Sequence, residues 1–276
     1  MPNSLSFQRP FLKWAGNKFR LLKHIIPHLP KGNRLIEPFA GSGSLTLNTQ
    51  YDAYWLNDLN ADLVGVYRQL KQRPTIFIAA CEAICQPENN QADHYYQLRE
   101  EFNACEDPYR RAVLFVYLNR HGFNGLCRYN KKGLYNVPFG RHVKPSVSKP
   151  ALQQFAKRLK HTKLTQLDFR TLMQQATDGD VVYCDPPYLP LTETANFTHY
   201  HHQSFEYDDQ LALAQAAKQL AERGITTLIS NHHCPLALEL YEGAEIIDFE
   251  ALRLISCKGV DRKPVREILA IYPHRK

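Results

Sequence analysis

The chain has 276 residues, of which 44% are hydrophobic and 22% charged, so it is long enough for one large or two small globular domains. No apolar run approaches the ~18 residues of a membrane span, and the start of the chain lacks the apolar centre of a signal peptide. These features argue against a membrane or secreted protein and predict a cytoplasmic one.

The net charge of +7 is unevenly distributed along the chain. The 60 residues from Pro108 to Leu167 contain 13 lysines and arginines and no acid, so the other residues together carry −6. An ordinary solvated basic surface interleaves acids with its bases. The segregation therefore favours a face that binds a polyanion, with nucleic acid as the first candidate.

The seven cysteines show neither a disulfide-like spacing nor a Cys-x2-Cys pair. Histidines gather at positions 199–202 and 232–233, but adjacent histidines in a strand point to opposite faces. We expect reduced, mostly buried thiols and no metal site.

Two strand-like segments near the N-terminus end at residues suited to a ligand. Arg34–Glu37 precedes a glycine turn and a helix from Ser44, and Tyr54–Asn57 ends at Asp58. This order is typical of a nucleotide-binding βαβ unit, in which the acid binds ribose hydroxyls. Thr46 stands in place of the third glycine of a dinucleotide fingerprint, which favours a cofactor with one adenosine and no pyrophosphate.

The middle of the chain is helical, and Asp107 and Pro108 are a typical N-cap and first residue of a helix. After the turn Gly122–Gly125, the runs Leu126–Asn130 and Leu134–Phe139 predict a β-hairpin rich in basic and aromatic residues. Such a ribbon fits a DNA major groove, where arginine pairs with guanine, and an aromatic residue beside a glycine turn can wedge into a base stack. An ordinary amphipathic hairpin is the alternative, but it does not account for the absent acids.

The later elements alternate between helix and strand. They are a helix over Pro150–Lys160, a strand over Leu164–Leu167 that leads to Asp168 and Phe169, a loop over Leu189–Phe205 that could close over a bound base, a helix from its cap Asp208 to Arg223, and strands over Thr226–Ser230, Glu245–Phe249 and Glu267–Tyr272.

The buried strand Val181–Cys184 ends at Asp185, Pro186, Pro187 and Tyr188. Two successive prolines cannot continue a sheet because neither has an N–H, and ligands bind at the edge where such strands end. The carboxylate and the backbone carbonyls can accept from an exocyclic NH2 group while Tyr188 stacks on its ring. A capped turn without a ligand is the alternative, and the neighbouring motifs argue against it.

Together the motifs closely resemble those of the Dam-type DNA adenine-N6 methyltransferases, which methylate GATC, over nearly the whole chain. The matching segments are Lys13–Lys18, Glu37–Gly43, Arg110–Arg120, Asn124–Asn130, Asn136–Arg141, Val181–Tyr188, Ala195–Thr198 and Leu228–His232. Asp-Pro-Pro-Tyr alone indicates an amino-methyltransferase, whereas the hairpin motif is specific to this family.

The resemblance implies the α/β fold of class I S-adenosylmethionine-dependent methyltransferases, with a Rossmann-like seven-stranded sheet. It implies a catalytic, cofactor-binding domain over residues 1–60 and 149–276 and an inserted helical target-recognition domain with a β-hairpin over residues 61–148, in the α arrangement of motifs. The implied reaction transfers a methyl group from S-adenosylmethionine to N6 of adenine in double-stranded DNA, at GATC, with base flipping and S-adenosylhomocysteine as product.

The resemblance also implies residue roles at matching positions, and no metal. The implied catalytic residues are Asp185, Pro186, Pro187 and Tyr188; the cofactor-binding residues are Trp14, Lys18, Phe39, Ala40, Gly41, Asp58, Asp168, Phe169 and Asp185; the DNA-binding residues are Lys13, Phe123, Asn124, Arg128, Pro138 and Arg141. Arg128 is expected to read a guanine. Phe123 stands where relatives have tyrosine, and His121 stands where another aromatic residue is common. These departures imply that flipping of the target base and the preference for flanking sequence can differ from those of relatives.

Other amino-methyltransferases are the alternative, acting on cytosine N4, RNA adenine, protein glutamine, or adenine at another DNA sequence in a restriction system. A DNA-binding regulator without catalysis is a more distant alternative. We expect a monomer in the bacterial cytoplasm, associated with the nucleoid through double-stranded DNA and without membrane contact. Mismatch repair, control of DNA replication, restriction and phage functions are all compatible with the sequence.

Overall fold

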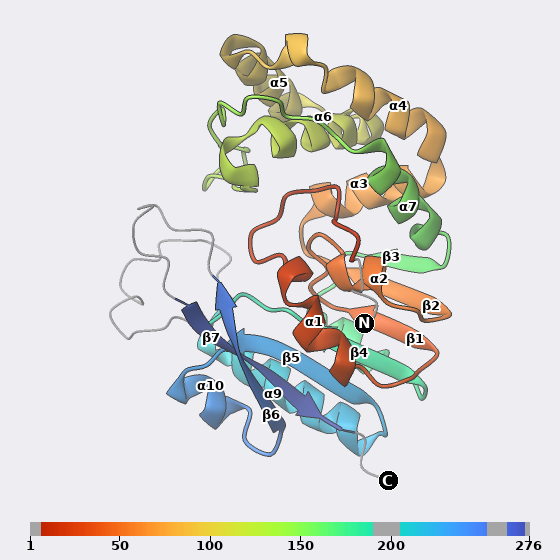
Figure 1. The fold of residues 1–276 in the computed structure, drawn as a ribbon, viewed down its shortest axis with the longest axis vertical. Coiled ribbons are helices and arrows are strands. Elements are labelled where there is room, and N and C mark those ends of the chain that lie inside the picture. Colours follow the sequence, from red (N-terminus) through yellow and green to blue (C-terminus); the bar gives the residue numbers. More distant parts are fainter. Residues whose placement is uncertain (1–6, 190–204, 253–263, 274–276) are drawn as a thin grey trace, which may run out of the picture. The chain divides into compact units, whose positions relative to one another are not determined.

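The structure is a computed structural model that describes residues 7–189, 205–252 and 264–273 (Figure 1). The strands are β1 Arg34–Glu37, β2 Ala53–Asn57, β3 Thr162–Thr165, β4 Asp180–Cys184, β5 Thr226–His232, β6 Glu245–Leu252 and β7 Pro264–Tyr272. The α-helices are α1 Leu22–Ile25, α2 Ser44–Asn48, α3 Ala61–Gln72, α4 Pro74–Ile84, α5 Ala92–Ala104, α6 Pro108–His121, α7 Lys149–Leu159, α8 Phe169–Gln174, α9 Tyr207–Glu222 and α10 Pro235–Leu240. Short 3-10 helices are η1 Lys18–Arg20, η2 Ile26–His28, η3 Pro87–Asn89 and η4 Phe123–Gly125.

The strands form one seven-stranded sheet in the order β3-β2-β1-β4-β5-β7-β6. β1 pairs in parallel with β2 and β4, β4 pairs in parallel with β5, and β7 is antiparallel to β5 and β6. The order reverses between β1 and β4, and ligands of open α/β sheets bind outside the carboxyl ends of the strands at such a switch point. The predicted seven-stranded sheet is confirmed, and the Asp-Pro-Pro-Tyr turn follows one of the two strands at the switch.

The chain divides into two compact units. The first contains residues up to Leu22 together with Ala40–Gln50 and Asp58–Gln166, and the second contains Lys23–Phe39, Tyr51–Asn57 and the residues from Leu167 onward. The polypeptide passes between them directly after β1 and directly after β2. Residues of the glycine turn and Asp58 therefore belong to the first unit, whereas the strands that lead to them belong to the second.

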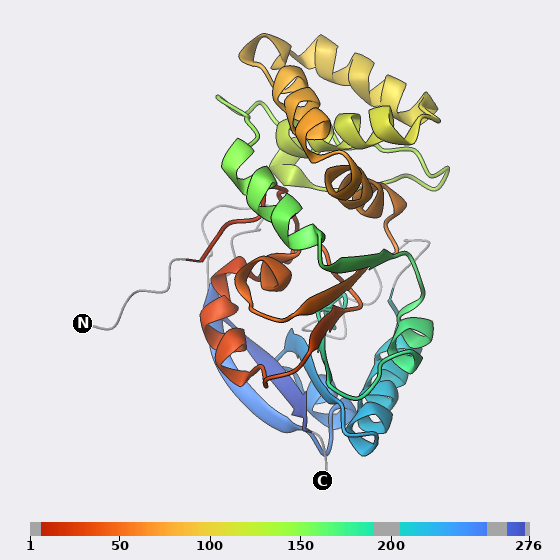
Figure 2. The ribbon, with the colours of Figure 1, turned by 90° about the vertical axis from the view of Figure 1, so that its right-hand side faces the viewer.

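In the second unit both faces of the central strands are covered. α8 and α9 lie on one face, and residues 23–28 lie on the other, where the ring of His24 stacks on Phe249 of β6 with centroids 4.8 Å apart (Figure 2). Every residue of β4 and β5 is buried. Burial on both faces explains why Val181–Cys184 of β4 is continuously apolar rather than alternating.

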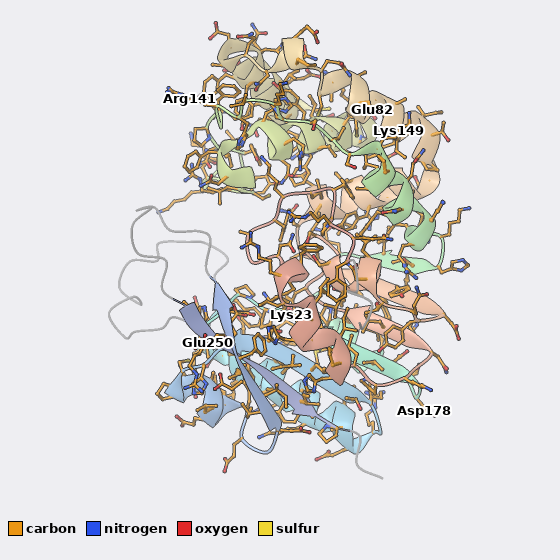
Figure 3. The ribbon with its side chains drawn as sticks, viewed as in Figure 1. Lys23, Glu82, Arg141, Lys149, Asp178 and Glu250 are labelled. Carbon is orange, nitrogen blue, oxygen red and sulfur yellow. The ribbon has the colours of Figure 1, made fainter. Side chains whose placement is uncertain are left out.

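In the first unit α6 is the central helix, in contact with α3, α4 and α5. Its residues 112–119 are all buried, and Asp107 caps it by accepting from the backbone N–H groups of Tyr109 and Arg110, as predicted. On the surface of this unit Lys149 Nζ lies 3.1 Å from Glu82 Oε2, which joins α7 to α4 (Figure 3).

Two predictions differ from the structure in detail, and a third cannot be compared with it. The strand predicted over 164–167 is β3 at Thr162–Thr165, and Asp168 is the N-cap of α8. The cap of α9 is Glu206, in a capping box with Asp209, so the prediction of Asp208 was wrong. The loop predicted to close over a base falls largely at 190–204, outside the described residues.

The predicted hairpin shows antiparallel pairing without regular strands. Its bridges join Tyr129 to Tyr135 and Gly122 to Phe139. Backbone hydrogen bonds flank the Tyr129–Tyr135 bridge, from Asn130 N to the Leu134 carbonyl at 2.9 Å and from Asn136 N to the Arg128 carbonyl at 3.1 Å. The backbone groups of Tyr135 face away from that arm toward Asn103 of α5, whose amide accepts from the Tyr135 N–H at 2.8 Å and donates to its carbonyl at 3.1 Å. A side chain thus satisfies the backbone groups on the outer edge of this arm.

The ion pair between Arg34 and Asp180 joins the first residues of β1 and β4, and Asp180 is only 4% exposed. We predict that Asp180→Ala lowers the free energy of unfolding by about 2–4 kcal/mol, because the arginine is left without its partner. Denaturant unfolding measures the change. The matched control is Glu101→Ala, which breaks the exposed pair with Arg110 and should cost less than ~1 kcal/mol. Equal losses in the two variants would contradict the prediction.

Candidate active site

The turn after β4 presents the four predicted catalytic residues at the carboxyl edge of the sheet. Asp185 and Tyr188 are half-buried, Pro186 is buried and Pro187 is exposed. The phenol of Tyr188 donates to Glu267 Oε2 at 2.9 Å, and its ring meets the ring of His232 edge to face at 4.7 Å. Burial, and then the negative charges of Asp185 and Glu267, raise the pKa of Tyr188 well above its usual value, so the phenol stays protonated.

Buried side chains of α9 and β5 hold the backbone of this turn. Gln210 Nε2 donates to the Pro187 carbonyl at 2.7 Å, and Asn231 Oδ1 accepts from Leu189 N at 3.1 Å. Asn231 Nδ2 in turn donates to Gln210 Oε1 at 3.2 Å and to the hydroxyl of Tyr241 at 2.9 Å. Buried polar groups that satisfy one another in this way fix a single geometry.

Aromatic rings gather beside the carboxyl end of β1. Phe39 lies 5.5 Å from Phe169 and 5.4 Å from Phe205, centroid to centroid, and Phe169 and Phe205 are also 5.4 Å apart. Asp168 is exposed, accepts from the backbone N–H of Arg170 at 2.9 Å and forms an ion pair with its guanidinium. The second unit thus brings the predicted residues Phe39, Asp168 and Phe169 close together.

In the first unit, Asp58 and the glycine turn form a tight arrangement. Asp58 Oδ2 accepts from Gly41 N at 3.0 Å, and Oδ1 accepts from Asn60 N at 2.9 Å. Gly41 has φ +48°, and a Cβ there would lie 2.9 Å from Trp14 Cδ1. Any larger residue at position 41 would therefore clash with the Trp14 indole. Lys18 is buried and donates to the Gly16 carbonyl at 2.8 Å.

These residues fit the cofactor that the sequence predicts. A carboxylate has about four acceptor positions, and backbone N–H groups use two of those on Asp58, so ribose hydroxyls could donate to the others. Burial raises the pKa of Asp58, and the two backbone hydrogen bonds counteract this effect. Within the described ranges no group of histidine, cysteine and acidic residues could hold a metal ion.

The predicted DNA-binding residues of the first unit include those around the turn Gly122–Gly125. Phe123 is 47% exposed and its N–H donates to the carbonyl of Pro138 at 2.9 Å, while Asn124 is exposed with φ 52°. Lys13 packs on Gly125, where a Cβ would lie 2.2 Å from the lysine Cβ. Burial and the nearby charge of Arg120 lower the pKa of Lys13 to about 8.

Arg128 is exposed and its guanidinium is already oriented. Its Nε donates to Asn136 Oδ1 at 2.7 Å, and its terminal nitrogen donates to the Asn136 carbonyl at 3.1 Å. Arg141 is exposed as well, with φ 49° (Figure 3). The structure therefore exposes both predicted arginines, and it supports Arg128 from the facing arm of the hairpin.

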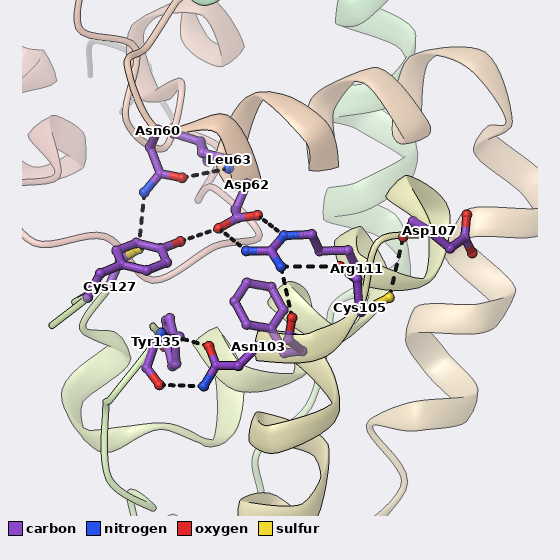
Figure 4. A network of polar contacts seen from close by, with 11 residues as sticks. Asn60, Asp62, Leu63, Asn103, Cys105, Asp107, Arg111, Cys127 and Tyr135 are labelled. Atoms are coloured by element: carbon purple, nitrogen blue, oxygen red, sulfur yellow. Dashed lines mark hydrogen bonds and ion pairs between the residues drawn. The ribbon is translucent and has the colours of Figure 1, made fainter. Parts of the chain in front are cut away.

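A polar network fastens the hairpin to the start of α3 (Figure 4). Asp62 accepts from Arg111 Nε at 2.5 Å and from the hydroxyl of Tyr129 at 2.5 Å, and Asn60 Nδ2 donates to Cys127 Sγ at 3.3 Å. Burial raises the pKa of Tyr129, so its hydroxyl remains a donor. The residues on either side of Arg128 are thus anchored to the segment that directly follows Asp58.

His121 does not lie on the surface of the first unit. Its ring is fully buried, stacks on Tyr117 with centroids 4.0 Å apart, and donates from Nδ1 to the Tyr117 carbonyl at 3.0 Å. The difference from the family pattern at His121 is therefore a change in the core of the first unit. Of the two positions that differ, only Phe123 is exposed.

The sequence did not reveal that Asn136, Gln210 and Glu267 support the site. These residues hold other side chains or the backbone in place and do not belong to the predicted set of catalytic or binding residues. Asn136 and Asn231 stand inside matching motifs, so their presence was noted although their contacts were not. Gln210 and Glu267 lie in a helix and a strand whose sequence pattern indicates only packing. The predicted free thiols are confirmed for the cysteines in the described ranges, four of which are buried.

Comparisons with known proteins agree with this arrangement. The family model of the D12 class N6 adenine-specific DNA methyltransferases matches residues 14–255. The DNA adenine methylases of Salmonella typhi and Escherichia coli K12 are each 49% identical over 264 residues, covering 96% of this chain and 95% of theirs. The DNA adenine methylase of Serratia marcescens is 48% identical over 265 residues, covering 96% and 98%.

The chain therefore belongs to the D12 class N6 adenine-specific DNA methyltransferases. Its sheet has the predicted class I fold, its methyl donor is S-adenosylmethionine and its substrate is DNA. None of the helices in the described ranges has the length and hydrophobicity that crossing a bilayer requires.

Burial lowers the pKa of His121 to about 4, whereas an unfolded histidine titrates near ~6.5. Between these pH values the unfolded chain binds a proton that the folded chain does not, so the free energy of unfolding should fall as the pH is lowered. Above pH ~6.5 this contribution disappears. We predict that His121→Phe, which keeps a ring against Tyr117, removes this part of the pH dependence.

Denaturant unfolding between pH 4 and 7.5 measures that slope. His161→Gln, at an exposed position, is the control and should leave the slope as it is in the wild type. An unchanged slope in His121→Phe would show that other groups cause the acid sensitivity.

Proposed function

We propose that this protein methylates N6 of adenine at GATC in double-stranded DNA, after turning the target base out of the duplex. The observation that carries the proposal is the rigid turn Asp185–Tyr188, held by buried side chains at the carboxyl edge of the switch-point strand β4. The names of relatives 48–49% identical to this chain and the acid-free basic segment support it.

The turn offers the groups that an adenine amino group needs. The Asp185 carboxylate and the Pro186 carbonyl accept the two N6 protons, and the Tyr188 ring stacks on the base. Gln210 occupies the carbonyl of Pro187, so that carbonyl does not compete for the amino group. Hydrogen bonds from the N6–H groups to these acceptors make the nitrogen lone pair more available for attack on the methyl group. Because the acceptors are fixed, they need no reorganisation during the reaction.

S-adenosylmethionine supplies an activated methyl group on a sulfonium when it is bound, so no base has to deprotonate N6 before transfer. In the proposal Asp58 binds the ribose hydroxyls, Lys18 binds the carboxylate of the donor and Trp14 packs on the turn at Ala40 and Gly41. Phe39, Asp168 and Phe169 lie at the adenine of the donor. The proton released from N6 after transfer passes to the Asp185 carboxylate and then to water.

The DNA contacts follow from exposure and charge in the first unit. Arg128, already oriented by Asn136, reads a guanine with two hydrogen bonds, and Lys13 and Arg141 add positive charge. Asn124 and Pro138 contact the bases or backbone beside Phe123, which wedges into the base stack. Residues 61–148 are the target-recognition domain and residues 1–60 and 149–276 the catalytic one, in a monomer that associates with the nucleoid through DNA.

The direct test is identification of the product. A duplex with a single GATC site is incubated with the protein and S-adenosylmethionine, digested to nucleosides and analysed by mass spectrometry. We expect N6-methyladenine at GATC and none in a duplex where that site reads GTTC. N4-methylcytosine, methylated RNA under the same conditions, or equal methylation of duplexes without GATC would overturn the assignment.

We predict that Asp185→Ala loses at least about 100-fold in the rate of methyl transfer, because a fixed acceptor of the reacting amino group is removed. DNA affinity should stay within about threefold, since the carboxylate makes no phosphate contact. Single-turnover kinetics and fluorescence anisotropy measure the two quantities. Asp178→Ala, an exposed acid before the opposite end of β4, is the control and should have wild-type activity (Figure 3). Near wild-type methylation by Asp185→Ala would refute the role of this turn.

For Arg128→Ala we predict a loss of ~1–3 kcal/mol in discrimination at one guanine, with a smaller loss on non-specific DNA. Competition binding between GATC and singly substituted duplexes at fixed salt measures the discrimination. Lys132→Ala, an exposed cation on the same hairpin, should weaken binding to all duplexes alike. If Arg128→Ala also weakens all duplexes equally, Arg128 is a phosphate contact.

A further inference from the structure

Tyr188 is held between two neighbouring strands. Glu267 of β7 lies opposite His232 of β5 in the antiparallel register. From these positions Glu267 accepts the phenol proton of Tyr188 at 2.9 Å, while the His232 ring meets the tyrosine ring edge to face. His232 is fixed in turn by donating from Nδ1 to the Leu189 carbonyl at 2.7 Å.

The bond between Tyr188 and Glu267 affects the electrons of the ring as well as its position. A phenol that donates to a carboxylate forms a charge-assisted hydrogen bond, which is stronger than a neutral one. The hydrogen bond shifts electron density from the O–H group toward the ring, and the faces of an aromatic ring are already its negative part. The carboxylate thus strengthens the attraction of the ring face for positive charge.

Methyl transfer places positive charge against that face. In the proposed reaction the N6 lone pair forms the new C–N bond, and the C–S bond of the donor breaks with its electron pair going to sulfur. The positive charge passes to the adenine and remains there until N6 releases its proton to Asp185. A group that attracts positive charge on the adenine stabilises the transition state more than the ground state, in which the adenine is neutral and the charge lies on sulfur. This difference raises the rate.

We propose that Glu267 is a positioning residue for methyl transfer, which acts through Tyr188 by making its ring a better partner for the adenine that becomes positively charged. The inference rests on the proposed function, because it requires a base stacked on Tyr188. It goes further because it gives the Tyr188 ring an electrostatic role. It also attributes the strength of that role to Glu267, which lies on β7, far from the Asp185–Tyr188 motif in the sequence.

Glu267→Gln separates charge from shape, because the amide oxygen can still accept from the phenol but carries no charge. We expect single-turnover methyl transfer at saturating DNA and S-adenosylmethionine to fall by roughly 5- to 30-fold, the size of a desolvated cation–π interaction. The affinities for both ligands should stay within about twofold of the wild type. Glu245→Gln, an exposed acid at the other end of the neighbouring strand β6, is the matched control and should leave the rate unchanged.

Two further measurements distinguish this role from structural support. In the Tyr188→Phe background, which has no phenol, Glu267→Gln should cause no additional loss of rate. A duplex with 2-aminopurine at the target position should show the wild-type fluorescence change when Glu267→Gln binds it, because the base is still turned out.

A wild-type rate in Glu267→Gln would overturn the inference and leave the proposed function intact, since the wild type would still form N6-methyladenine. The same loss of rate in both backgrounds, or a reduced fluorescence change, would overturn it by showing a structural effect. If Glu267→Gln fails to fold, Tyr188→Phe still decides, because a wild-type rate in that variant contradicts any role of the phenol. A wild-type protein that forms no N6-methyladenine would instead refute the proposed function.

Discussion

The hydrogen bonds of Gln210 and Asn231 to the turn after β4 are the constraint on which the proposed active site depends. Prolines at 186 and 187 remove two backbone donors, so the turn cannot be fixed by a ladder of backbone hydrogen bonds. Buried amide side chains replace that ladder by binding the Pro187 carbonyl and the Leu189 N–H. Because the amides also bind each other, a shift of one would leave buried polar atoms without partners. The proposed acceptors for the adenine amino group therefore keep their positions.

The residues that we propose contact DNA are held in a different way. Phe123, Asn124 and Arg128 are exposed, as the proposed contact with a duplex requires, and their support lies in the backbone beneath them. Asp62 accepts hydrogen bonds from Arg111 and Tyr129. These bonds anchor the hairpin beside Arg128 and leave the Arg128 side chain out of the network. An arginine that is oriented by Asn136 before binding loses less conformational freedom when it pairs with a base. Recognition side chains can thus be exposed and still be preorganised.

The sequence predicted where β1, β2 and β4 end, because glycine, proline and acidic residues with local conformational reasons follow these strands. The ends of β3, β5 and β6 were not predicted correctly. It placed Asp58 and Asp185 after their strands correctly. It did not predict the contacts of Gln210 or Glu267, since a glutamine on a helix and a glutamate in a strand carry no local signal of a partner more than twenty residues away. It did not predict the bond of the Asn103 amide to the outer edge of the hairpin at Tyr135, because that partner lies on α5, more than thirty residues away in the sequence.

The two departures from the family pattern have different consequences because their burial differs. His121 replaces one ring with another in the core, where its Nδ1–H is satisfied by the carbonyl of Tyr117, so the change affects stability rather than DNA contact. Phe123 is exposed, and its backbone is fixed by the bond to Pro138. A tyrosine inserted among bases would need a partner for its hydroxyl or lose a hydrogen bond to water. Phenylalanine has no such requirement, so insertion in the proposed complex depends on stacking and on the burial of apolar surface alone.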